Sequence, residues 1–308
     1  MKRRVVVTGL GLLSCLGNDP ESFFRNLIDG VSGITAHPDI PKHPVGWIAF
    51  NAEEHLSKIE LLGLDRVSQF ALHASRQALA MARLDTNDIE QAGILYGTGF
   101  GGASTLESSY GNYFGIKKCA RVLTIPMVMM HAPASQISIH FGVRGECQTY
   151  STACSSSSIA IGEGFRRIQD GYLDVAITGG AECMLLPSVI AEWEKLRVLA
   201  PTQGIPSQGC RPFAANRSGF HLAEGAATVI LEERAHAIAR GAKILGEIVG
   251  YGISSDGEHI TKPSARGQAL AIRRAIAEAH ITPNDIGYIN LHGTATQSGD
   301  AAEAESIT

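Results

Sequence analysis

Aromatic residues make up only 6% of the 308 residues of this chain, and charged residues only 18%. The formal net charge of -4 at pH 7 gives no electrostatic basis for binding nucleic acid. No apolar run is long enough to span a bilayer. The six cysteines are widely spaced, without a Cys-x-x-Cys pair or a Cys/His cluster. This spacing argues against a zinc site and a disulfide framework, and we expect neither metal nor cofactor.

Glycine, by contrast, is abundant, with 34 residues. Many glycines and few aromatics are typical of an α/β protein with tight turns and close contacts between helices and the sheet. A chain of this length can bury a large core, either as one big domain or as two coupled domains.

The N-terminal segment has two interpretations. Met1–Arg4 followed by an apolar run resembles a signal peptide, and Leu12–Cys15 resembles a lipoprotein cleavage box. The alternative is a buried strand over Arg4–Thr8 that ends in a turn at Gly9 and Gly11.

An internal repeat favours the strand. Residues 247–255 repeat the pattern of residues 7–14, with Gly250 and Gly252 in place of the first two glycines. Because a mid-chain copy cannot be a signal sequence, we predict a strand at the N-terminus and a cytoplasmic protein.

A second repeat relates residues 78–89 to residues 275–286. In each copy we predict that an Ala-rich helix ends, a short polar turn follows, and a strand begins, at 92–96 and at 287–291. The repeat is too long-range for a solenoid and predicts two related α/β halves, the second opening near Lys243.

Start and stop signals predict further elements. For the first helix, Asp19 is the predicted N-cap and Pro20 the first residue. We predict helices at 19–29, 66–83, 104–114 and 132–141, strands at 174–181 and 226–232, irregular surface structure at 31–60, and a long loop at 199–220.

Three familiar motifs are incomplete. Gly9-Leu10-Gly11 follows a predicted strand, but Ser14 replaces the third glycine of a dinucleotide fingerprint. No Walker lysine follows the glycine-rich residues 97–102. The serines after residue 154 are not in a Gly-x-Ser-x-Gly elbow, which argues against a serine hydrolase.

One cysteine stands at a predicted junction of strand and helix, in the segment Ser151–Cys154. We interpret the preceding residues from Cys147 as a short buried strand, and the following residues as a helix to about Asp170. Unpaired N–H groups and the helix dipole favour a thiolate at a helix start, and the thiolate is the nucleophile. The ordinary alternative is a small buried hydrophobic residue.

His292 is the second candidate for chemistry. It follows the predicted strand at 287–291, at the edge where open α/β sheets bind ligands. Gly293 frees the backbone, and Thr294 and Thr296 add hydroxyls. A histidine hydrogen-bonded within a turn is the alternative, although a duplicated architecture can bring Cys154 and His292 to the joint between the halves.

Five motifs resemble those of the β-ketoacyl-[acyl-carrier-protein] synthases, most of all synthase II. The resemblance runs in order from Arg4 to Glu305. It implies the thiolase-like α/β fold, with two αβαβα halves in five layers: residues 1–242 with the nucleophile, and residues 243–308 opening the second half. The motifs are Thr152-Ala153-Cys154, Gly179–Glu182, Arg211–Phe213 with Glu224, Ser254–Asp256, and Asn290–Thr296.

The resemblance implies a decarboxylative condensation in fatty-acid or polyketide-type biosynthesis. Cys154 would take an acyl group from a carrier-protein thioester, and its N–H would form part of the oxyanion hole. His292 would act on malonyl-carrier protein and stabilise the enolate left by decarboxylation. The further residues implied are Thr294, Thr296 and Thr261 for substrate binding, Leu106 for the acyl pocket, and Glu303 for supporting the family's active-site lysine.

Departures from the family pattern lead to further expectations. That lysine, a second histidine and a Gly-Phe-Gly-Gly loop would lie beyond Thr308, so we expect a truncated second half, with acyl transfer retained and condensation impaired. The alternative is a non-catalytic partner for dimerisation or carrier docking, which the presence of both Cys154 and His292 disfavours. A specialised lipid or polyketide pathway is suggested by five departures, at Ala214, Ser218, His221, Ala223 and Ala227.

The implied partners are an acyl carrier protein and a second copy of the chain, with no nucleic acid and no membrane. Because carrier proteins are acidic, we expect a basic docking patch. Its candidates, each of which can also be ordinary surface charge, are Arg66, Lys117, Lys118, Arg121 and Arg211.

Overall fold

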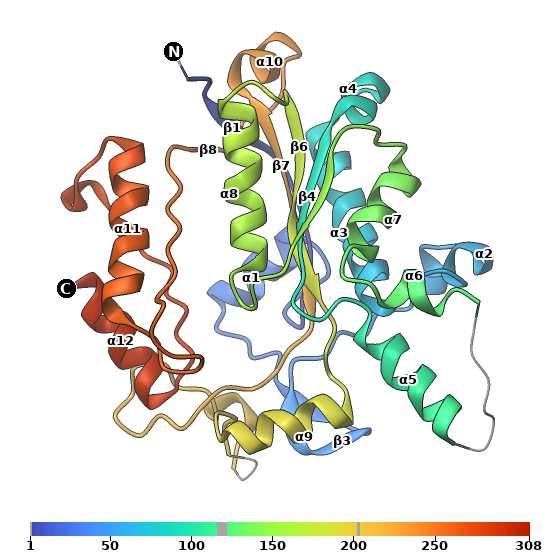
Figure 1. Ribbon diagram of the computed structural model, residues 1–308, viewed down its shortest axis with the longest axis vertical. Helices are drawn as coiled ribbons and strands as arrows, with labels where there is room; N and C mark the ends of the chain where they lie inside the picture. The colour runs from blue at the N-terminus through green and yellow to red at the C-terminus, as the bar shows by residue number, and fades with distance from the viewer. Residues whose placement is uncertain (1, 116–121, 202–203) are drawn as a thin grey trace. The chain divides into compact units, whose positions relative to one another are not determined.

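A computed structural model describes residues 2–115, 122–201 and 204–308 (Figure 1). The chain divides into two compact units. Unit 1 comprises residues 1–32, 47–186 and 223–248, and unit 2 comprises residues 33–46, 187–222 and 249–308. Each unit is therefore assembled from three separate segments of the chain.

Unit 1 contains a six-stranded sheet in the order β5-β4-β6-β7-β1-β8. Strand β4 runs parallel to β5 and β6, whereas β7 is antiparallel to both β6 and β1. The strands predicted at 92–96, 174–181 and 226–232 are confirmed to within one residue at each end. The strands are β1 (Val5–Leu13), β4 (Gly93–Gly97), β5 (Cys147–Tyr150), β6 (Val175–Glu182), β7 (Gly225–Glu233) and β8 (Gly246–Ile248).

The prediction of a turn at Gly9 and Gly11 was wrong, because both glycines lie inside the nine-residue strand β1. Helix α3 (Arg66–Ala82) packs so closely on this strand that side chains do not fit. A Cβ at Gly9 would lie 2.2 Å from the carbonyl oxygen of Ala78, and one at Gly11 would lie 2.0 Å from that of Ala74. The glycines therefore permit a close approach of strand and helix, and the strand interpretation of the N-terminus is confirmed.

The predicted helices of unit 1 are confirmed to within about one residue. Asp19 caps the first helix by accepting the N–H of Ser22. Helices α3 and α8 cover opposite faces of the sheet (Figure 1). The helices are α1 (Pro20–Ile28), α2 (Lys58–Leu61), α3, α4 (Thr86–Gln91), α5 (Ala103–Phe114), α6 (Thr124–Val128), α7 (Ala132–Phe141), α8 (Ser156–Gln169) and α10 (Arg234–Ala239), with a 3₁₀ turn η1 at Ala52–Glu54.

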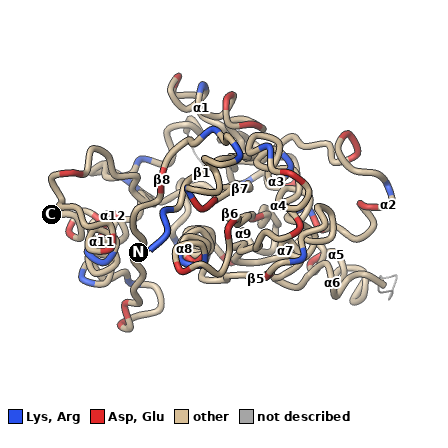
Figure 2. The backbone as a smooth tube through the Cα atoms, turned by 90° about the horizontal axis from the view of Figure 1, so that it is seen from above, with Lys and Arg blue, Asp and Glu red and all other residues tan. Residues whose placement is uncertain are grey.

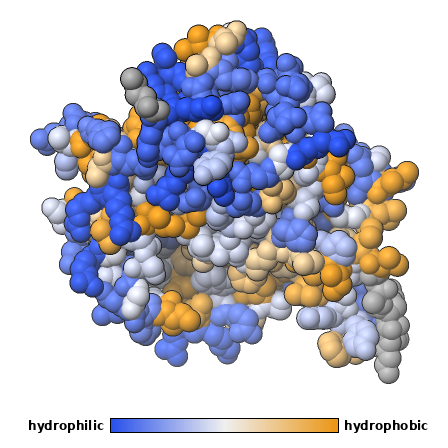
Figure 3. All heavy atoms as spheres, turned by 45° about the horizontal axis from the view of Figure 1, so that its top comes forward, coloured by the Kyte–Doolittle hydropathy of each residue, from blue (hydrophilic) through white to orange (hydrophobic). Residues whose placement is uncertain are grey.

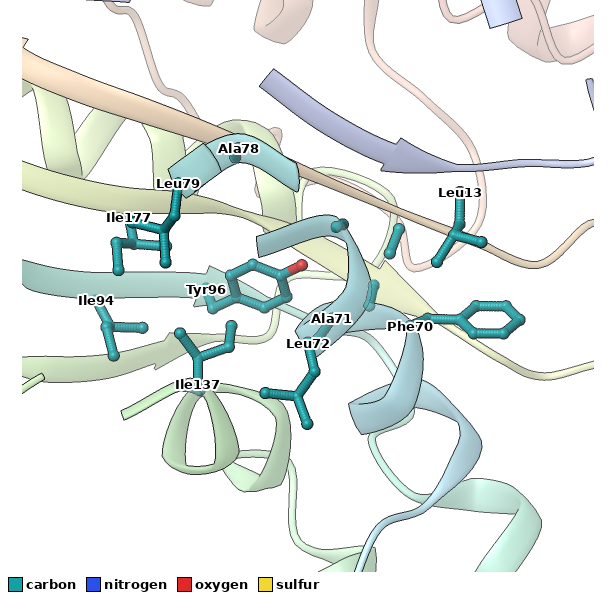
Figure 4. Close-up of a cluster of buried hydrophobic side chains, with 14 of the residues drawn as sticks. Leu13, Phe70, Ala71, Leu72, Ala78, Leu79, Ile94, Tyr96, Ile137 and Ile177 are labelled. Carbon is teal, nitrogen blue, oxygen red and sulfur yellow. The ribbon is translucent and has the colours of Figure 1, made fainter. Parts of the chain in front are cut away.

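The hydrophobic core of unit 1 lies between the sheet and helices α3 and α7 (Figure 4). Tyr96 is fully buried there, beside Ile94, Ile137 and Leu72. Its hydroxyl bonds to that of Thr228 at 3.1 Å, so the one polar atom of this ring is satisfied inside the core.

Unit 2 repeats the glycine contact of unit 1. A Cβ at Gly250 would lie 2.3 Å from the carbonyl oxygen of Ala275, and one at Gly252 would lie 1.9 Å from that of Ala271, both in helix α11. The elements of unit 2 are β2 (Thr35–His37), β3 (Ile40–Val45), α9 (Pro187–Leu196), η2 (Pro206–Gln208), α11 (Ala265–Ala279), η3 (Pro283–Asp285) and α12 (Gln297–Ile307).

Both copies of the second repeat also end alike. Helix α3 ends at Arg83 with φ 54°, and α11 ends at His280 with φ 55°, so each helix closes on a left-handed residue. A new turn then begins at Asp85 in one copy and at Thr282 in the other. The repeat seen in the sequence thus corresponds to the same local structure in each unit.

Three predictions of backbone structure need correction. Residues 31–60 are not irregular throughout, since β2 and β3 pair as an antiparallel hairpin and α2 and η1 follow. Residues 287–291 form no strand, because the described part of the chain provides no neighbouring strand for them, and Tyr288 is 81% exposed. The loop predicted at 199–220 is confirmed among its described residues, apart from the short turn η2.

Candidate active site

Cys154 lies in a tight turn between β5 and α8 and is exposed. The preceding Ala153 has φ 52°, a left-handed conformation that costs energy for a residue with a Cβ. The helix N-cap is Ser155. Cys154 therefore sits one residue before the cap, slightly outside the helix start that the sequence predicted.

The serines that follow the cysteine hold this turn together. The Ser156 hydroxyl donates to the carbonyl of Ala153 at 2.6 Å and accepts the N–H of Thr152 at 2.9 Å. The Ser155 hydroxyl donates to the carbonyl of Thr152 at 2.8 Å. Short polar side chains of this kind stabilise turns by bonding to nearby backbone groups.

The turn lies at the carboxyl ends of the parallel strands β4, β5 and β6. Gly97 ends β4 and Gly180 lies near the end of β6, and because neither has a Cβ, the first turn of α8 can pack against these strands. A Cβ at Gly97 would lie 2.4 Å from the carbonyl carbon of Ser156, and one at Gly180 would lie 2.7 Å from the Cβ of Ser157. Strand β5 is at the sheet edge and its Cys147 is exposed, so the prediction of a buried strand was wrong.

The glycine-rich residues after β4 are tied to a carboxylate that the sequence reasoning did not single out as functional. Glu182, the last residue of β6, accepts the N–H of Gly99 at 2.7 Å and that of Phe100 at 3.3 Å. Burial raises the pKa of this carboxyl group, while the backbone donors oppose the shift. The sequence did contain a signal for this contact. One predicted strand is followed directly by an acidic residue, and another is followed by a glycine-rich segment.

Leu106 lies in the first turn of α5, directly after the glycine loop, and donates its N–H to the carbonyl of Gly102 at 3.1 Å. Its side chain is 37% exposed. Asp65 ties this helix to the start of α3, because its carboxylate accepts from both the hydroxyl and the N–H of Thr105. Leu106 thus belongs to the same unit as Cys154.

His292 is exposed in a loop of unit 2 that precedes α12. The carboxylate of Glu303 accepts the N–H of His292 at 2.6 Å and that of Gly293 at 2.8 Å. Glu303 therefore fixes the backbone on which the histidine stands, a role that the sequence did not indicate.

The three predicted substrate threonines have different surroundings, all within unit 2. The hydroxyls of Thr294 and Thr296 lie 3.0 Å apart, and that of Thr296 also caps α12 by accepting the N–H of Gly299. Thr261 is exposed in another loop, where its N–H donates to Nδ1 of His259 at 3.1 Å.

A buried carboxylate missed by the sequence reasoning locks the loop after His292. Asp300 is 1% exposed and accepts the N–H of Ala295 at 3.0 Å and that of Phe213 at 2.6 Å. Both donors are left-handed, with φ 57° and 63°. Arg217 pairs with the same carboxylate at 3.3 Å, so one side chain supports two strained turns.

Other described cysteines are poorer nucleophile candidates than Cys154. Burial raises the pKa of Cys15 and Cys210, and it raises that of Cys183 further. A raised thiol pKa reduces the fraction of reactive thiolate at neutral pH.

Two candidates for the expected basic docking patch, Arg66 and Arg211, lie among the described residues. Arg66 donates hydrogen bonds to the buried Glu224 and to the carbonyl of Ile48. Because its guanidinium is engaged in these structural bonds, we no longer include Arg66 in the docking patch. Arg211 donates to two carbonyls of its own loop. Along the described chain, basic and acidic residues are interspersed (Figure 2). Lys117, Lys118 and Arg121 lie outside the described residues.

Among the residues that the structure describes, no group of three or more His, Cys, Asp or Glu side chains is arranged to hold a metal ion. Within the same residues, no helix has both the length and the apolar character that crossing a membrane requires.

The chain has an exposed cysteine before a helix at the carboxyl edge of parallel strands, and its two units repeat the close contact of a glycine pair with a helix. These features are typical of the thiolase-like fold class. Solved structures agree with this assignment. A β-ketoacyl synthase from Burkholderia phymatum has a TM-score of 0.92 at 33% identity, over 99% of this chain and 77% of that one. A type II polyketide ketosynthase in complex with its acyl-carrier protein has a TM-score of 0.88 at 27% identity, over 99% and 77% of the two chains.

The chain belongs to the β-ketoacyl synthase family of acyltransferases. Residues 2–237 match the family's N-terminal domain and residues 245–308 match its C-terminal domain. A 3-oxoacyl-[acyl-carrier-protein] synthase 2 of Staphylococcus aureus is 38% identical over 99% of this chain and 76% of its own length. The corresponding Synechocystis protein is 36% identical over 99% and 76% of the two chains.

Proposed function

We propose that the chain is a 3-oxoacyl-[acyl-carrier-protein] synthase in which Cys154 is the nucleophile. The thiolate attacks the carbonyl of an acyl thioester, and the carrier thiolate leaves. The single observation that carries this proposal is the exposed position of Cys154 in a strained, hydroxyl-braced turn at the carboxyl edge of the sheet. The N–H of Cys154 contributes to stabilising the oxyanion.

His292 acts on the second substrate in this proposal. Malonyl-carrier protein loses CO₂, and a hydrogen bond from the imidazole to the thioester oxygen stabilises the resulting enolate. The enolate carbon attacks the acyl-cysteine, forming the C–C bond and expelling the Cys154 thiolate. The hydrogen bonds that the N–H groups of His292 and Gly293 donate to the Glu303 carboxylate support this role, since they fix the backbone that carries the imidazole.

We assign the remaining residues by their resemblance to the family. Thr294 and Thr296 bind the pantetheine arm, with Thr261 in a second loop, and Leu106 lines the acyl pocket. Glu303 corresponds to the carboxylate that supports the family's active-site lysine, in addition to accepting its two backbone hydrogen bonds. We place the boundary between the halves at residues 242 and 243, between the segments that match the two family domains.

The proposed partners are an acyl carrier protein and a second copy of this chain. Edge strand β5 leaves one side of the described sheet open for pairing. On the same unit, α5 and α6 expose apolar side chains, and Figure 3 shows apolar side chains gathered at the right of the molecule. The exposed side chains of α5 and α6 include Tyr110, Tyr113, Phe114 and Ile125, at 55% to 79% exposure. Such a surface is typical of an interface.

Intact-mass analysis with an acyl-loaded carrier protein tests the nucleophile. We expect one acyl adduct on the wild-type chain and none on Cys154→Ala, because only the thiol forms the thioester. Adding malonyl-carrier protein then tests condensation: any 3-oxoacyl product that the wild type forms should be lost in His292→Ala, while this variant keeps the adduct.

The outcomes also separate the alternatives. An adduct without product means that acyl transfer is intact and condensation is impaired in this chain. A folded wild type without an adduct favours the non-catalytic partner for dimerisation or carrier docking. That alternative has some support from a solved match at 26% identity that contains a ketosynthase and a chain length factor.

A further inference from the structure

Glu182 forms an unusual set of bonds for a largely buried carboxylate. Its two oxygens accept the N–H of Gly99 and that of Phe100, and the hydroxyl of Thr98 lies 3.4 Å from one of them. The same hydroxyl accepts the N–H of Gly101 at 3.1 Å. One carboxylate and one hydroxyl thus fix four consecutive residues, which we call the glycine loop (residues 98–101).

The glycine loop lies directly against the turn that carries Cys154. The N–H of Thr98 donates to the carbonyl of Tyr150 at 3.1 Å, at the end of β5. A Cβ at Gly99 would lie 4.0 Å from Cα of Ala153 and 2.8 Å from the Glu182 carboxylate. The loop is therefore the layer between the carboxylate and the strained residue that precedes the nucleophile.

The far end of the glycine loop is equally confined. Gly101 has φ 56°, and a Cβ there would lie 3.0 Å from Cα of Met130. In the next residue, Gly102, a Cβ would lie 2.0 Å from the carbonyl oxygen of Met127. Neighbouring backbone therefore confines this end of the loop, whereas Phe100 in its middle is exposed.

Only a carboxylate satisfies all the donors that point at Glu182. Both of its oxygens accept hydrogen bonds, whereas glutamine replaces one oxygen with an NH₂ group that can only donate. A glutamine at this position would oppose a donor with a donor and leave one N–H of the loop without its acceptor.

We propose that Glu182 is a positioning residue for the nucleophile: it fixes the glycine loop, and the loop in turn fixes the Ala153–Cys154 turn in its reactive geometry. This inference rests on the proposed acyl transfer to Cys154. Misplacing reacting atoms by about 1 Å can cost on the order of a hundredfold in rate. A loss of that kind falls on the chemical step rather than on binding.

The test compares Glu182→Gln with Glu232→Gln. Glu232 is a fully buried carboxylate on β7 whose partners include Arg240 and His236, so it controls for the loss of a buried charge. Thr98→Val removes a single hydroxyl from the loop and provides a milder variant if Glu182→Gln does not fold. For each folded variant, hydrogen exchange of residues 151–156 and the kinetics of acyl transfer are measured.

We expect Glu182→Gln to increase exchange in residues 151–156 and to lower kcat for acyl transfer at least about tenfold, with KM within about twofold. Alkylation of Cys154 by iodoacetamide should persist, because it needs exposure but no alignment. Unchanged exchange in residues 151–156, unchanged kcat, or an equal effect of Glu232→Gln would overturn the inference. A wild type that alkylates but takes no acyl group would refute the proposed function, while the exchange result would still decide the role of Glu182.

Discussion

Strand β1 and helix α3 approach so closely that Gly11→Ala is a sharp test of how they pack. A Cβ at this position would lie 2.0 Å from the carbonyl oxygen of Ala74 and 2.8 Å from the amide nitrogen of Ala78. Non-bonded atoms ordinarily approach to about 3.5 Å, so strand and helix would have to separate by about 1.5 Å. Both obstructing atoms belong to the backbone, and no change of rotamer relieves the contact.

Overpacking of this kind typically costs about 1–3 kcal/mol. Alanine also lowers the conformational entropy of the unfolded chain, and this effect stabilises the folded state by only about 0.4–1 kcal/mol. We therefore expect Gly11→Ala to lower the free energy of unfolding by about 2 kcal/mol in urea titrations followed by circular dichroism.

A matched control is Gly111→Ala in the interior of α5, where a Cβ would meet no atom within 4 Å. This substitution should raise stability by about 0.5–1 kcal/mol, because alanine is the better helix former. The reasoning is refuted if Gly11→Ala lies within about 0.5 kcal/mol of the wild type, which is the ordinary range of surface substitutions.

Three further predictions concern named side chains. Burial lowers the pKa of His73 to about 4 from an ordinary 6.5, so unfolding takes up a proton between these values. The stability that neutral His73 contributes is present above pH 6.5 and is lost as the pH falls toward 4. Between pH 7 and pH 4.5, the melting temperature of His73→Phe should therefore fall by less than that of the wild type. Equal decreases in melting temperature would contradict this. Asp300→Asn should lower the free energy of unfolding by about 3–5 kcal/mol, because it breaks the buried charge pair with Arg217. It should also speed amide exchange at Phe213 and Ala295, and unchanged exchange would exclude the role given to Asp300. Asp19→Ala should cost about 1 kcal/mol in urea unfolding through loss of the α1 cap, and a neutral result would mean that the cap bond contributes little.

The sequence predicted the helices well because their signals are local. Asp19 and Pro20 mark the start of α1, and Arg83 ends α3, all within a few residues of the boundaries they define. Strands depend on neighbours that are distant in sequence. Residues 287–291 carry a strand pattern, but the described chain provides no ladder partner for them, and the pattern alone could not reveal this.

The prediction of a turn at Gly9 and Gly11 was wrong for the same reason. Gly9 and Gly11 signalled a turn locally, whereas their role is set by helix α3, more than sixty residues further along the chain. In the candidate site, Cys154 and His292 were recognisable from their motifs. Glu182 and Asp300 were not, because the donors of Glu182 lie 82 and 83 residues away along the chain, and one of the two donors of Asp300 lies 87 residues away.

The chemistry-bearing segments of the two units are supported in a common way. Glu182 accepts adjacent N–H groups of the loop that borders the Cys154 turn, and Glu303 accepts those of His292 and Gly293. Loops need such acceptors, because their backbone has no ladder or helix to satisfy it. A carboxylate can accept at both oxygens, so it can hold two donors of a turn that no regular element holds. At such positions a carboxylate supplies the acceptor geometry, and the surrounding donors offset the cost of its charge.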